Sequence, residues 1–584
     1  MKIDKAIIFK IPARIGYHFT YLPSQAIGVI NGYLRQSGIE PYSYDIEDVI
    51  GTDGAYRLHS KISSESAALM QKYIDRDNHE FDEFFSILSK KINLGGFSLF
   101  LISVDPVSAE AALAAIFLSK YIKKYKADSI IILGGEGMIF GYAHEPFKKN
   151  ILYSLDFIVE GHHIENIAKI IKCVEQGHGL SDIPAITYYD KDAKKITQNP
   201  YLEKPQRLDM LDFGNFNLGY YRLRLADFLP KRYVFNPDNT MLLMPFTFIH
   251  GCPHVCAFCV EGLHKSMDHL APKKVVRILG ELSSKYDTRY FMFLNNTLNI
   301  SRDYADELCD CIIQSGLKLT WSDCVNVKNL DRELLFKMRK AGAARLVFGC
   351  ETGSNRLLEF CQKGFTAEDI KKCLRWSHEA GIWNGVEIIT GMPQENEEDI
   401  KNTIDFINSN RDIIDEIYVN PFMLYRRSYF FERPGQFGIE NIVDSDVDPF
   451  QKLRRKRNLI LDFDSFRYRF DEKNGKKWNE KMEQALHSYT KTVSSTEARL
   501  SPTTEVDLHI LLYLYGHFDN KADISKIYKS FLKKTIFSKL FKKDAFLFFS
   551  REARRRPYKL SALLFMKILL SQYIAWPFKK QRDL

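Results

Sequence analysis

Residues 241–262 read MLLMPFTFIHGCPHVCAFCVEG, an apolar run of strand length followed at once by three cysteines. The chain has ten cysteines in 584 residues, and three of them, Cys252, Cys256 and Cys259, fall within eight positions. Ten cysteines spread over this length do not make a disulfide scaffold, which favours a reducing compartment where thiols can bind metal. Three thiols at this spacing, in a loop that directly follows a strand, can face one metal centre.

The spacing alone leaves the identity of the metal open. Zinc takes four ligands, and His254, His264 or His269 could supply the fourth. A loop of three free thiols without metal is a second alternative. The third is a 4Fe–4S cluster with three protein ligands, which needs another group at the fourth iron because such clusters usually take four cysteines.

The cysteine loop opens a long alternation of strands and helices. Helical patterns lie near 273–286, 302–315, 330–341, 366–380 and 398–411. Six stretches have the character of buried strands: MLLMPFTFIHG, TRYFMFLNN, LKLTWSDCV, ARLVFGCE, GVEIITGMP and EIYVNPFMLY. Residues 241–445 are therefore predicted to form an incomplete parallel (β/α)6 barrel, whose chemistry belongs at the carboxyl ends of the strands. Those ends carry Cys252, Asn295, Asn296, Glu351 and Gly391.

Residues 1–205 show a similar α/β alternation. The strand-like runs KAIIFKI, SLFLISV, SIIILGG and DFIVEG are separated by helical patterns such as SAEAALAAIFLSKYIKKY. This order predicts a Rossmann-like, doubly wound parallel sheet that binds ligands beyond the carboxyl ends of its strands. Ser103, Gly134, Gly135 and Gly161 fall at those ends. Residues 206–240 lack periodicity and are interpreted as a connector.

The last part of the chain, residues 446–584, is predicted to be a mainly helical, basic domain. Residues 451–584 hold 30 Lys and Arg against 14 Asp and Glu, a net charge of +16, whereas the whole chain carries +9. A solvated basic face is the plain interpretation, and an anionic substrate or an anionic membrane surface are alternatives. The apolar stripe LLFMKILLSQYIAW (563–576) is expected to cover the open side of the barrel. No RNA-binding module is recognisable, so we expect no nucleic-acid partner.

The loop CPHVCAFC resembles the Cys-x3-Cys-x-aromatic-Cys signature of radical S-adenosylmethionine (SAM) enzymes, with Phe258 as the aromatic. The stretches FGCETGSNRLLEFCQKGFTAEDI and IITGMPQENEEDI resemble that superfamily's fourth and fifth strands. The resemblance implies a 4Fe–4S cluster on the three cysteines, SAM chelated to the open iron, and a 5′-deoxyadenosyl radical that takes a hydrogen atom from the substrate. The SAM contacts that it implies are Phe258, Asn295, Asn296, Glu351 and Gly391.

Two of these roles are less directly implied. The family's common Gly-Gly-Glu form is absent at Asn295 and Asn296, which leaves their contact with the SAM amino group open. The alternative role for Glu351 is structural: a carboxylate at the barrel mouth that pairs with an arginine such as Arg345.

Residues 1–205 resemble the cobalamin-binding domain that precedes the barrel in one subgroup of these enzymes. The resemblance assigns the cobalamin contacts to Ser103, Gly134, Gly135 and Gly161, where glycine lets backbone approach a bulky ligand. The usual Gly-Glu-Gly-Glu element reads GHHIE at 161–165, and the Asp-x-His-x-x-Gly motif is missing, as is common in this family. His18 is the only nearby candidate for the cobalt ligand, and a loop histidine without that role is the alternative. The alternative is a Rossmann-like module that only packs on the barrel.

The resemblance as a whole implies a cytoplasmic, cobalamin-dependent radical SAM methyltransferase. Its substrate would be a small molecule or a peptide, methylated at an unactivated carbon, and its electron donor a flavodoxin or ferredoxin. The N-terminus lacks the features of a signal peptide. A radical cyclase or rearrangement enzyme with the same cofactors, and a non-catalytic sensor of redox state or cobalamin, remain as alternatives. No catalytic side chain is assigned from the sequence.

Overall fold

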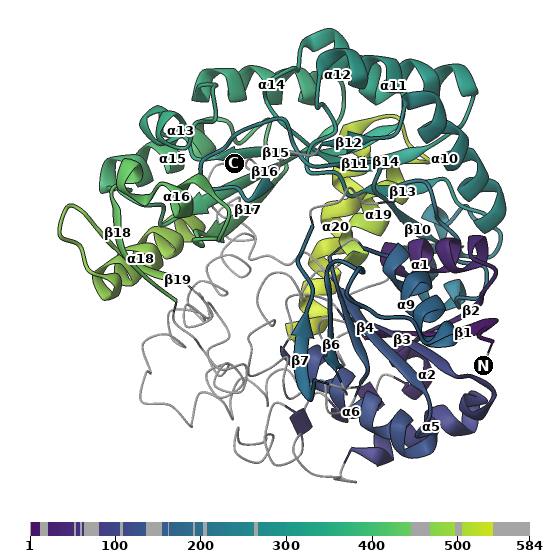
Figure 1. The fold of residues 1–584 in the computed structure, drawn as a ribbon. Helices are drawn as coiled ribbons and strands as arrows, with labels where there is room; N and C mark the ends of the chain where they lie inside the picture. Colours follow the sequence, from purple (N-terminus) through teal and green to yellow (C-terminus); the bar gives the residue numbers. More distant parts are fainter. Residues whose placement is uncertain are drawn as a thin grey trace.

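Two mainly parallel sheets, one within residues 5–198 and one within residues 243–421, organise the protein (Figure 1). The computed structural model describes residues 2–540 apart from 12–21, 52–53, 56, 59–60, 63–80, 105–108, 136–154, 162, 191–192, 203–206, 262–266, 445–467 and 497–504.

The N-terminal sheet has seven strands in the order β2-β1-β3-β4-β5-β6-β7. Strands β1 to β5 are parallel, and β6 and β7 extend the sheet antiparallel. The predicted doubly wound sheet is thus confirmed, whereas β2, β6 and β7 are additions to the predicted strands. The bounds are β1 (Lys5–Ile11), β2 (Glu40–Asp45), β3 (Leu99–Val104), β4 (Ile130–Gly135), β5 (Phe157–Glu160), β6 (Ile186–Asp190) and β7 (Lys195–Gln198).

Helices cover both faces of this sheet because its central strands are apolar on both sides. In β1, Ile8 packs toward α1 and α9, whereas its neighbours Ile7 and Phe9 pack toward α2, α5 and α6. The helices are α1 (Gln25–Gln36), α2 (Ile46–Ile50), α5 (Asp82–Lys91), α6 (Ala109–Tyr125) and α9 (Glu165–Gln176). The strand order reverses between β1 and β3, so the carboxyl ends of these two strands border the crevice where such sheets bind ligands.

The second sheet is the predicted six-stranded partial barrel. Its strands are all parallel, in the order β10-β13-β14-β15-β16-β17, with β10 and β17 at the edges. The bounds are β10 (Leu243–Phe246), β13 (Tyr290–Phe293), β14 (Thr320–Val325), β15 (Ala343–Glu351), β16 (Trp383–Thr390) and β17 (Glu416–Pro421).

Six helices line the outer side of the barrel sheet (Figure 1). Five of them begin at a Ser, Asp, Thr or Asn whose side chain accepts a backbone N–H of the first turn, the usual N-terminal cap. They are α10 (Pro272–Tyr286), α11 (Arg302–Ser315), α12 (Arg332–Lys340), α13 (Asn355–Phe360), α14 (Ala367–Glu379) and α15 (Glu397–Ser409). A short antiparallel pair, β11 (Ile249–His250) and β12 (Asp268–His269), flanks the cysteine loop.

The connector ties the two sheets together. It contains short 3-10 turns and the antiparallel pair β8 (Leu223–Arg224) and β9 (Thr240–Met241). Asp212 contacts Arg35 of α1 and accepts a hydrogen bond of 2.9 Å from Lys285 of α10. At the opposite end of α1, the backbone N–H of Thr247, just beyond β10, donates a 2.8 Å hydrogen bond to Oε1 of Gln25. The carboxyl edges of the two sheets therefore adjoin.

The described C-terminal residues pack around the barrel. Helix α18 (Trp478–Thr496) lies against α15 and the edge strand β17. Helices α19 (Glu505–Tyr515) and α20 (Lys521–Leu540) cover the amino ends of the strands, where the Tyr515 hydroxyl donates to the carbonyl of Gly381. The stripe at 563–576 lies outside the described residues, so its predicted cover role is untested. Within the part described, no helix is long and apolar enough to cross a membrane.

One feature near position 445 differs from the prediction. A hairpin of β18 (Ile439–Asp444) and β19 (Tyr468–Glu472) spans the expected boundary between barrel and helical domain. It is preceded by α16 (Tyr429–Glu432). Tyr468 and Phe470 of β19 alternate inward onto Phe430 and Phe437, a two-residue period that the surrounding helical pattern masked.

Candidate active site

The cysteine loop is fixed over the carboxyl ends of the last barrel strands. The backbone N–H of Ala257 donates to the carbonyl of Cys361 after α13, and the carbonyl of Ala257 accepts from Phe430 of α16. The Ala257 side chain is buried in an apolar cluster that includes Met392, next to the end of β16. The loop that carries the three cysteines is therefore held where a parallel barrel does its chemistry.

Burial alone keeps the three thiols protonated. It raises the pKa of Cys252, Cys256 and Cys259, the last to about 12. A thiolate is the form that binds metal, so these thiols need a nearby positive charge such as the iron of a cluster. Among the described residues, no three His, Cys, Asp or Glu side chains form a group that could hold a single metal ion. A cubane cluster does not require the three thiols to converge on a single ion, because each thiolate binds a separate iron.

The histidines considered as a fourth zinc ligand are placed differently. His254 lies inside the loop, with a buried Nε2 for which the described part of the chain provides no hydrogen-bond partner. Burial, together with the charges of Lys328 and Lys363, lowers its pKa to about 4, so its imidazole is neutral. His269 is on β12, with its ring against Tyr304. His264 lies outside the described residues.

A buried ion pair lies next to the cysteine loop. Lys363 Nζ is 3.0 Å from Glu351 Oε1, and the same ammonium group is 5.7 Å from the ring centroid of Phe258. Burial opposes the charge on Lys363, but Glu351 and Cys256 outweigh it and raise the pKa of the lysine. Lys363 was not among the predicted site residues, because it stands in the mixed stretch EFCQKGFT without a distinctive pattern.

Glu351 reaches this pair through an irregular end of β15. The register between β15 and β16 shifts between Gly349 and Glu351, and Glu351 has a φ of 65°. A side chain at position 349 would stand 3.0 Å from Glu351 Oε1, so glycine makes room for the carboxylate. The suggested alternative partner, Arg345, is instead 3.0 Å from Glu416. Arg345 lies near the amino end of β15, too far down the strand to reach Glu351.

Asn295 has a structural role in this fold. Its Oδ1 accepts the backbone N–H groups of Phe248 and Ile249, and its Nδ2 donates to Asp323 at 2.7 Å. Both ends of the amide are thus used to join three strand ends. Asn296 is exposed. The predicted contact with SAM is untested for both asparagines, and the exposed side chain of Asn296 is better placed for it than the hydrogen-bonded side chain of Asn295.

Gly391 is also explained in part by packing. It has a φ of 76°, and a Cβ there would stand 2.5 Å from the Cβ of Ala485 on α18. Its N–H donates to Glu395 Oε2 at 2.9 Å. The glycine lets α18 approach the loop after β16, and its predicted SAM contact is untested.

The four cobalamin candidates lie along one edge of the N-terminal sheet. Ser103 is in register with Gly134, and Gly135 with Glu160, the residue before Gly161. Gly135 has a φ of 141°, and a Cβ there would stand 2.1 Å from the carbonyl oxygen of Val104, so only glycine fits. A Cβ at Gly134 would meet nothing closer than 3.7 Å. His18 falls in a stretch that the structure does not describe.

The inner face of the barrel sheet, turned away from α10–α15, carries residues that the sequence analysis did not select. Side chains on the helix-facing side, such as Val386 and Ile388 of β16, are fully buried. On the inner face, Cys324, Gly349, Glu387, Ile389 and Tyr418 are partly exposed. Glu387 was recognisable as the one charged residue in the apolar strand GVEIIT.

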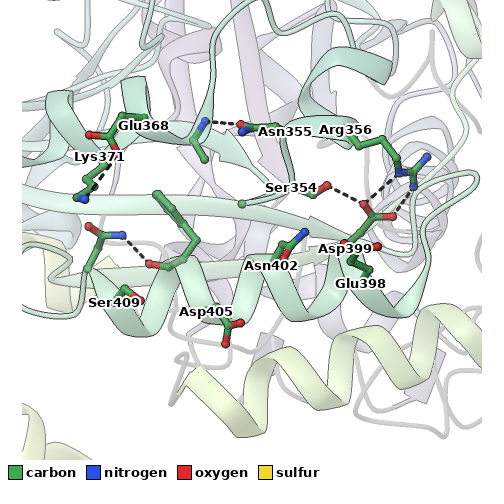
Figure 2. A pocket seen from close by; sticks show the side chains of 14 residues that line it. Ser354, Asn355, Arg356, Glu368, Lys371, Glu398, Asp399, Asn402, Asp405 and Ser409 are labelled. Atoms are coloured by element: carbon green, nitrogen blue, oxygen red, sulfur yellow. Dashed lines mark hydrogen bonds and ion pairs between the residues drawn. The ribbon is translucent and has the colours of Figure 1, made fainter.

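A pocket among the described residues lies away from the cysteine loop (Figure 2). It has a volume of about 560 Å³ and is lined by residues of α13, α14 and α15, including Glu368, Lys371 and Asn402. Asp399 at its end accepts a 2.6 Å hydrogen bond from Ser354 and pairs with Arg356, which anchors the loop after Glu351. The pocket is on the helical side of the barrel and holds none of the predicted site residues.

Residues 246–407 match the model of the radical SAM superfamily. The barrel is a radical SAM domain. The match begins at the end of β10, includes the whole cysteine loop and ends within α15, so the domain contains both the cysteines and the Glu351–Lys363 pair.

Relatives of the radical SAM domain extend the comparison. The chain is 23% identical over 308 residues to an uncharacterized methyltransferase of Pyrococcus horikoshii, covering 52% of this chain and 63% of that protein. It is 25% identical over 311 residues to the anaerobic magnesium-protoporphyrin IX monomethyl ester cyclase of Rubrivivax gelatinosus, covering 51% and 53%. The matches therefore span between half and two thirds of these relatives.

A solved structure matches nearly the whole chain. The radical SAM methyltransferase TsrM from Kitasatospora setae, determined with cobalamin and a [4Fe-4S] cluster bound, superposes with a TM-score of 0.58 at 15% identity. The match covers 91% of this chain and 100% of that one. The N-terminal sheet and the radical SAM domain thus share the overall fold of that enzyme.

Proposed function

We propose that this protein is a cobalamin-dependent radical SAM enzyme in which the two sheets serve one reaction site. The observation that carries the proposal is the hydrogen bond between Thr247 and Gln25, because it joins the carboxyl edges of the two sheets. These are the edges at which both kinds of parallel sheet bind their ligands. A cofactor at each edge would therefore be within reach of a common substrate.

The side chains present fit the three cofactors. Cys252, Cys256 and Cys259 would hold a 4Fe–4S cluster, since they are buried thiols that need a cation to ionise. Phe258, Asn296, Glu351 and Gly391 would contact SAM. Ser103, Gly134, Gly135 and Gly161 would border cobalamin at the sheet edge. When bound, these groups supply a 5′-deoxyadenosyl radical and a transferable methyl group.

The protein's own residues would prepare the site for this chemistry. The ion pair of Glu351 and Lys363 neutralises itself beneath the loop, so it adds no net charge beside the thiols. Tight packing of Ala257 and Met392 excludes water on one side of the loop. Exclusion of water protects reactive intermediates from side reactions.

Methylation of an unactivated carbon is the reaction that we propose. It is supported by the likeness in fold to a methyltransferase and by the Pyrococcus relative, which is also named as one. The relative from Rubrivivax is a cyclase, which supports a radical cyclisation as the second candidate. A small-molecule or peptide substrate and a flavodoxin or ferredoxin as electron donor complete the proposal, with the cytoplasm as the location that suits ten free cysteines.

The experiment is reductive cleavage of SAM by the anaerobically reconstituted full chain. We expect one 4Fe–4S cluster per chain and formation of 5′-deoxyadenosine after addition of dithionite and SAM. Cys256→Ala should abolish both, whereas Cys311→Ala, a partly exposed cysteine on α11, should abolish neither. Stoichiometric zinc without iron, or a cluster-loaded protein that forms no 5′-deoxyadenosine, would contradict the proposal and favour a zinc site or a sensor.

Transfer of the methyl group tests whether the proposed reaction is a methylation. With isotopically labelled SAM and bound cobalamin, a methyltransferase should place the label on cobalamin before any substrate is added. Cleavage of SAM without labelled cobalamin would favour the cyclase alternative.

A further inference from the structure

Glu387 lies on the inner face of the radical SAM domain. A Cβ at Gly385, two residues earlier on β16, would stand 3.4 Å from the side chain of Val347 and 3.3 Å from the ring of Tyr418. Alternate residues of a strand share a face, so Glu387 faces the same side as these residues. Its register partners are Gly349 on β15 and Tyr418 on β17. The space next to Gly349 is filled by the buried ion pair, because a Cβ there would stand 3.0 Å from Glu351 Oε1 and 3.6 Å from Lys363 Nζ.

The other charges near Glu387 are already paired. Arg345 is 3.0 Å from Glu416, and Lys363 is 3.0 Å from Glu351. Among the residues that the structure describes, no hydrogen bond or ion pair is found for Glu387. Glu387 is therefore the uncompensated acidic group on this face.

An uncompensated carboxyl in this position is costly to ionise. Burial raises the pKa of Glu387 to about 7, and the Glu351 carboxylate adds to the effect while Arg345 and Lys363 oppose it. A buried charge normally requires a partner of opposite sign. Since the residue is partly exposed, the partner can come from a ligand.

We propose that Glu387 is a substrate-positioning residue that binds a cationic group, an amine or a guanidine, carried on an apolar body. Val347, Ile389 and the ring of Tyr418 provide the apolar surroundings for that body. The assignment of this face to the substrate rests on the proposed function. Charge repulsion disfavours an anionic group next to Glu387. The group that binds inside the barrel is therefore not the anionic substrate that the basic C-terminal segment suggested.

The test uses the full chain and a matched pair of probes, 2-phenylethylamine and 2-phenylethanol, in ligand-observed NMR titrations. The wild-type protein should bind the amine about tenfold more tightly than the alcohol, the size expected of one charge-assisted hydrogen bond. Its affinity for the amine should rise from pH 6 to pH 8 as Glu387 ionises while the amine stays protonated. Glu387→Gln should remove both the preference and the pH dependence.

The control is Glu281→Gln, which removes one negative charge from the exposed outer face of α10 and should preserve the preference. Equal affinities of the wild-type protein for the two probes would overturn the proposal. This comparison does not depend on whether any variant folds. Unchanged amine binding by Glu387→Gln would also overturn it. A loss of SAM binding by that variant with amine binding intact would assign Glu387 to the cofactor instead. Failure of the wild-type protein to cleave SAM would count against the proposed function alone, since probe binding is measured without turnover.

Discussion

Lys363 Nζ lies 3.0 Å from the Glu351 carboxylate, and both side chains are buried beside the cysteine loop. Buried pairs of this kind often contribute little net stability, because desolvation offsets the attraction. The backbone is nevertheless shaped for it, since Glu351 has a left-handed φ of 65° and Gly349 leaves the space. The pair is therefore better understood as fixing the end of β15 under the loop than as a source of stability.

Removal of one partner should be costly. Lys363→Met leaves the Glu351 carboxylate buried and unpaired, and we expect the free energy of unfolding to fall by about 3–5 kcal/mol. The double variant Lys363→Met/Glu351→Gln should recover most of this loss. The measurement is urea denaturation under anaerobic conditions. Lys491→Met, which breaks the exposed pair with Glu397, should cost less than about 1 kcal/mol. A single variant as stable as the wild-type protein would show that the pair is not buried as described.

Gly391 should be more sensitive to substitution than a glycine with the same backbone conformation in open space. Gly391→Ala adds a contact of 2.5 Å with Ala485 to the strain of a positive φ. We expect a loss of about 2–5 kcal/mol, the sum of backbone strain and overpacking. Gly316→Ala, at a φ of 71° with nothing within 4 Å, should lose only about 1–2 kcal/mol. Equal losses in thermal or urea unfolding would mean that α18 does not pack here.

Regular periodicity made much of this fold predictable. Short apolar strands that alternate with amphipathic helices indicated both parallel sheets, and the spacing of Cys252, Cys256 and Cys259 located the loop. The strand β7 was missed because KITQ is short, polar and at the sheet edge, and β6 was missed because ITYYD is short and ends in polar residues. The hairpin that contains Tyr468 was missed for a similar reason, since it lies within a basic helical pattern.

The site was harder to predict than the fold. Asn295 and Gly391 stand at strand ends, as predicted, but their contacts are with Asp323 and Ala485, residues that are distant in the sequence. Lys363 was missed because its significance comes from its pairing with Glu351, and Glu387 was missed because its significance comes from its strand neighbours Gly349 and Tyr418. A sequence gives a residue's position on a strand, whereas partnership depends on which strands become neighbours and in what register.

Asp323 should make stability depend on pH. Burial raises the pKa of Asp323 to about 8, although hydrogen bonds from Asn295 and Cys324 oppose the effect. In the unfolded chain the group titrates near about 3.9. Between these values the folded protein holds a proton that the unfolded chain releases, so the free energy of unfolding should fall as pH rises from about 4 to about 8. In urea denaturation at pH 5 and pH 8, Asp323→Asn should show a smaller decline than the wild-type protein. An equal or steeper decline would contradict a buried, protonated Asp323.

Two adjacent glycines separate cobalamin binding from sheet integrity. A side chain at Gly135 would collide with the Val104 carbonyl, so Gly135→Ala should destabilise the sheet whether or not a corrin binds. Gly134 has no neighbour closer than 3.7 Å to a new Cβ, and valine suits a strand, so Gly134→Val should fold. If the corrin lies against this edge, the valine should lower its retention by about tenfold or more through steric exclusion. Retention is measured by absorbance after purification of protein produced with cobalamin uptake. Gly179→Val, at an exposed site with nothing within 4 Å, is the control that should retain the corrin. A folded Gly134→Val variant that retains as much corrin as this control would show that the carboxyl edge at Gly134 is not the cobalamin site.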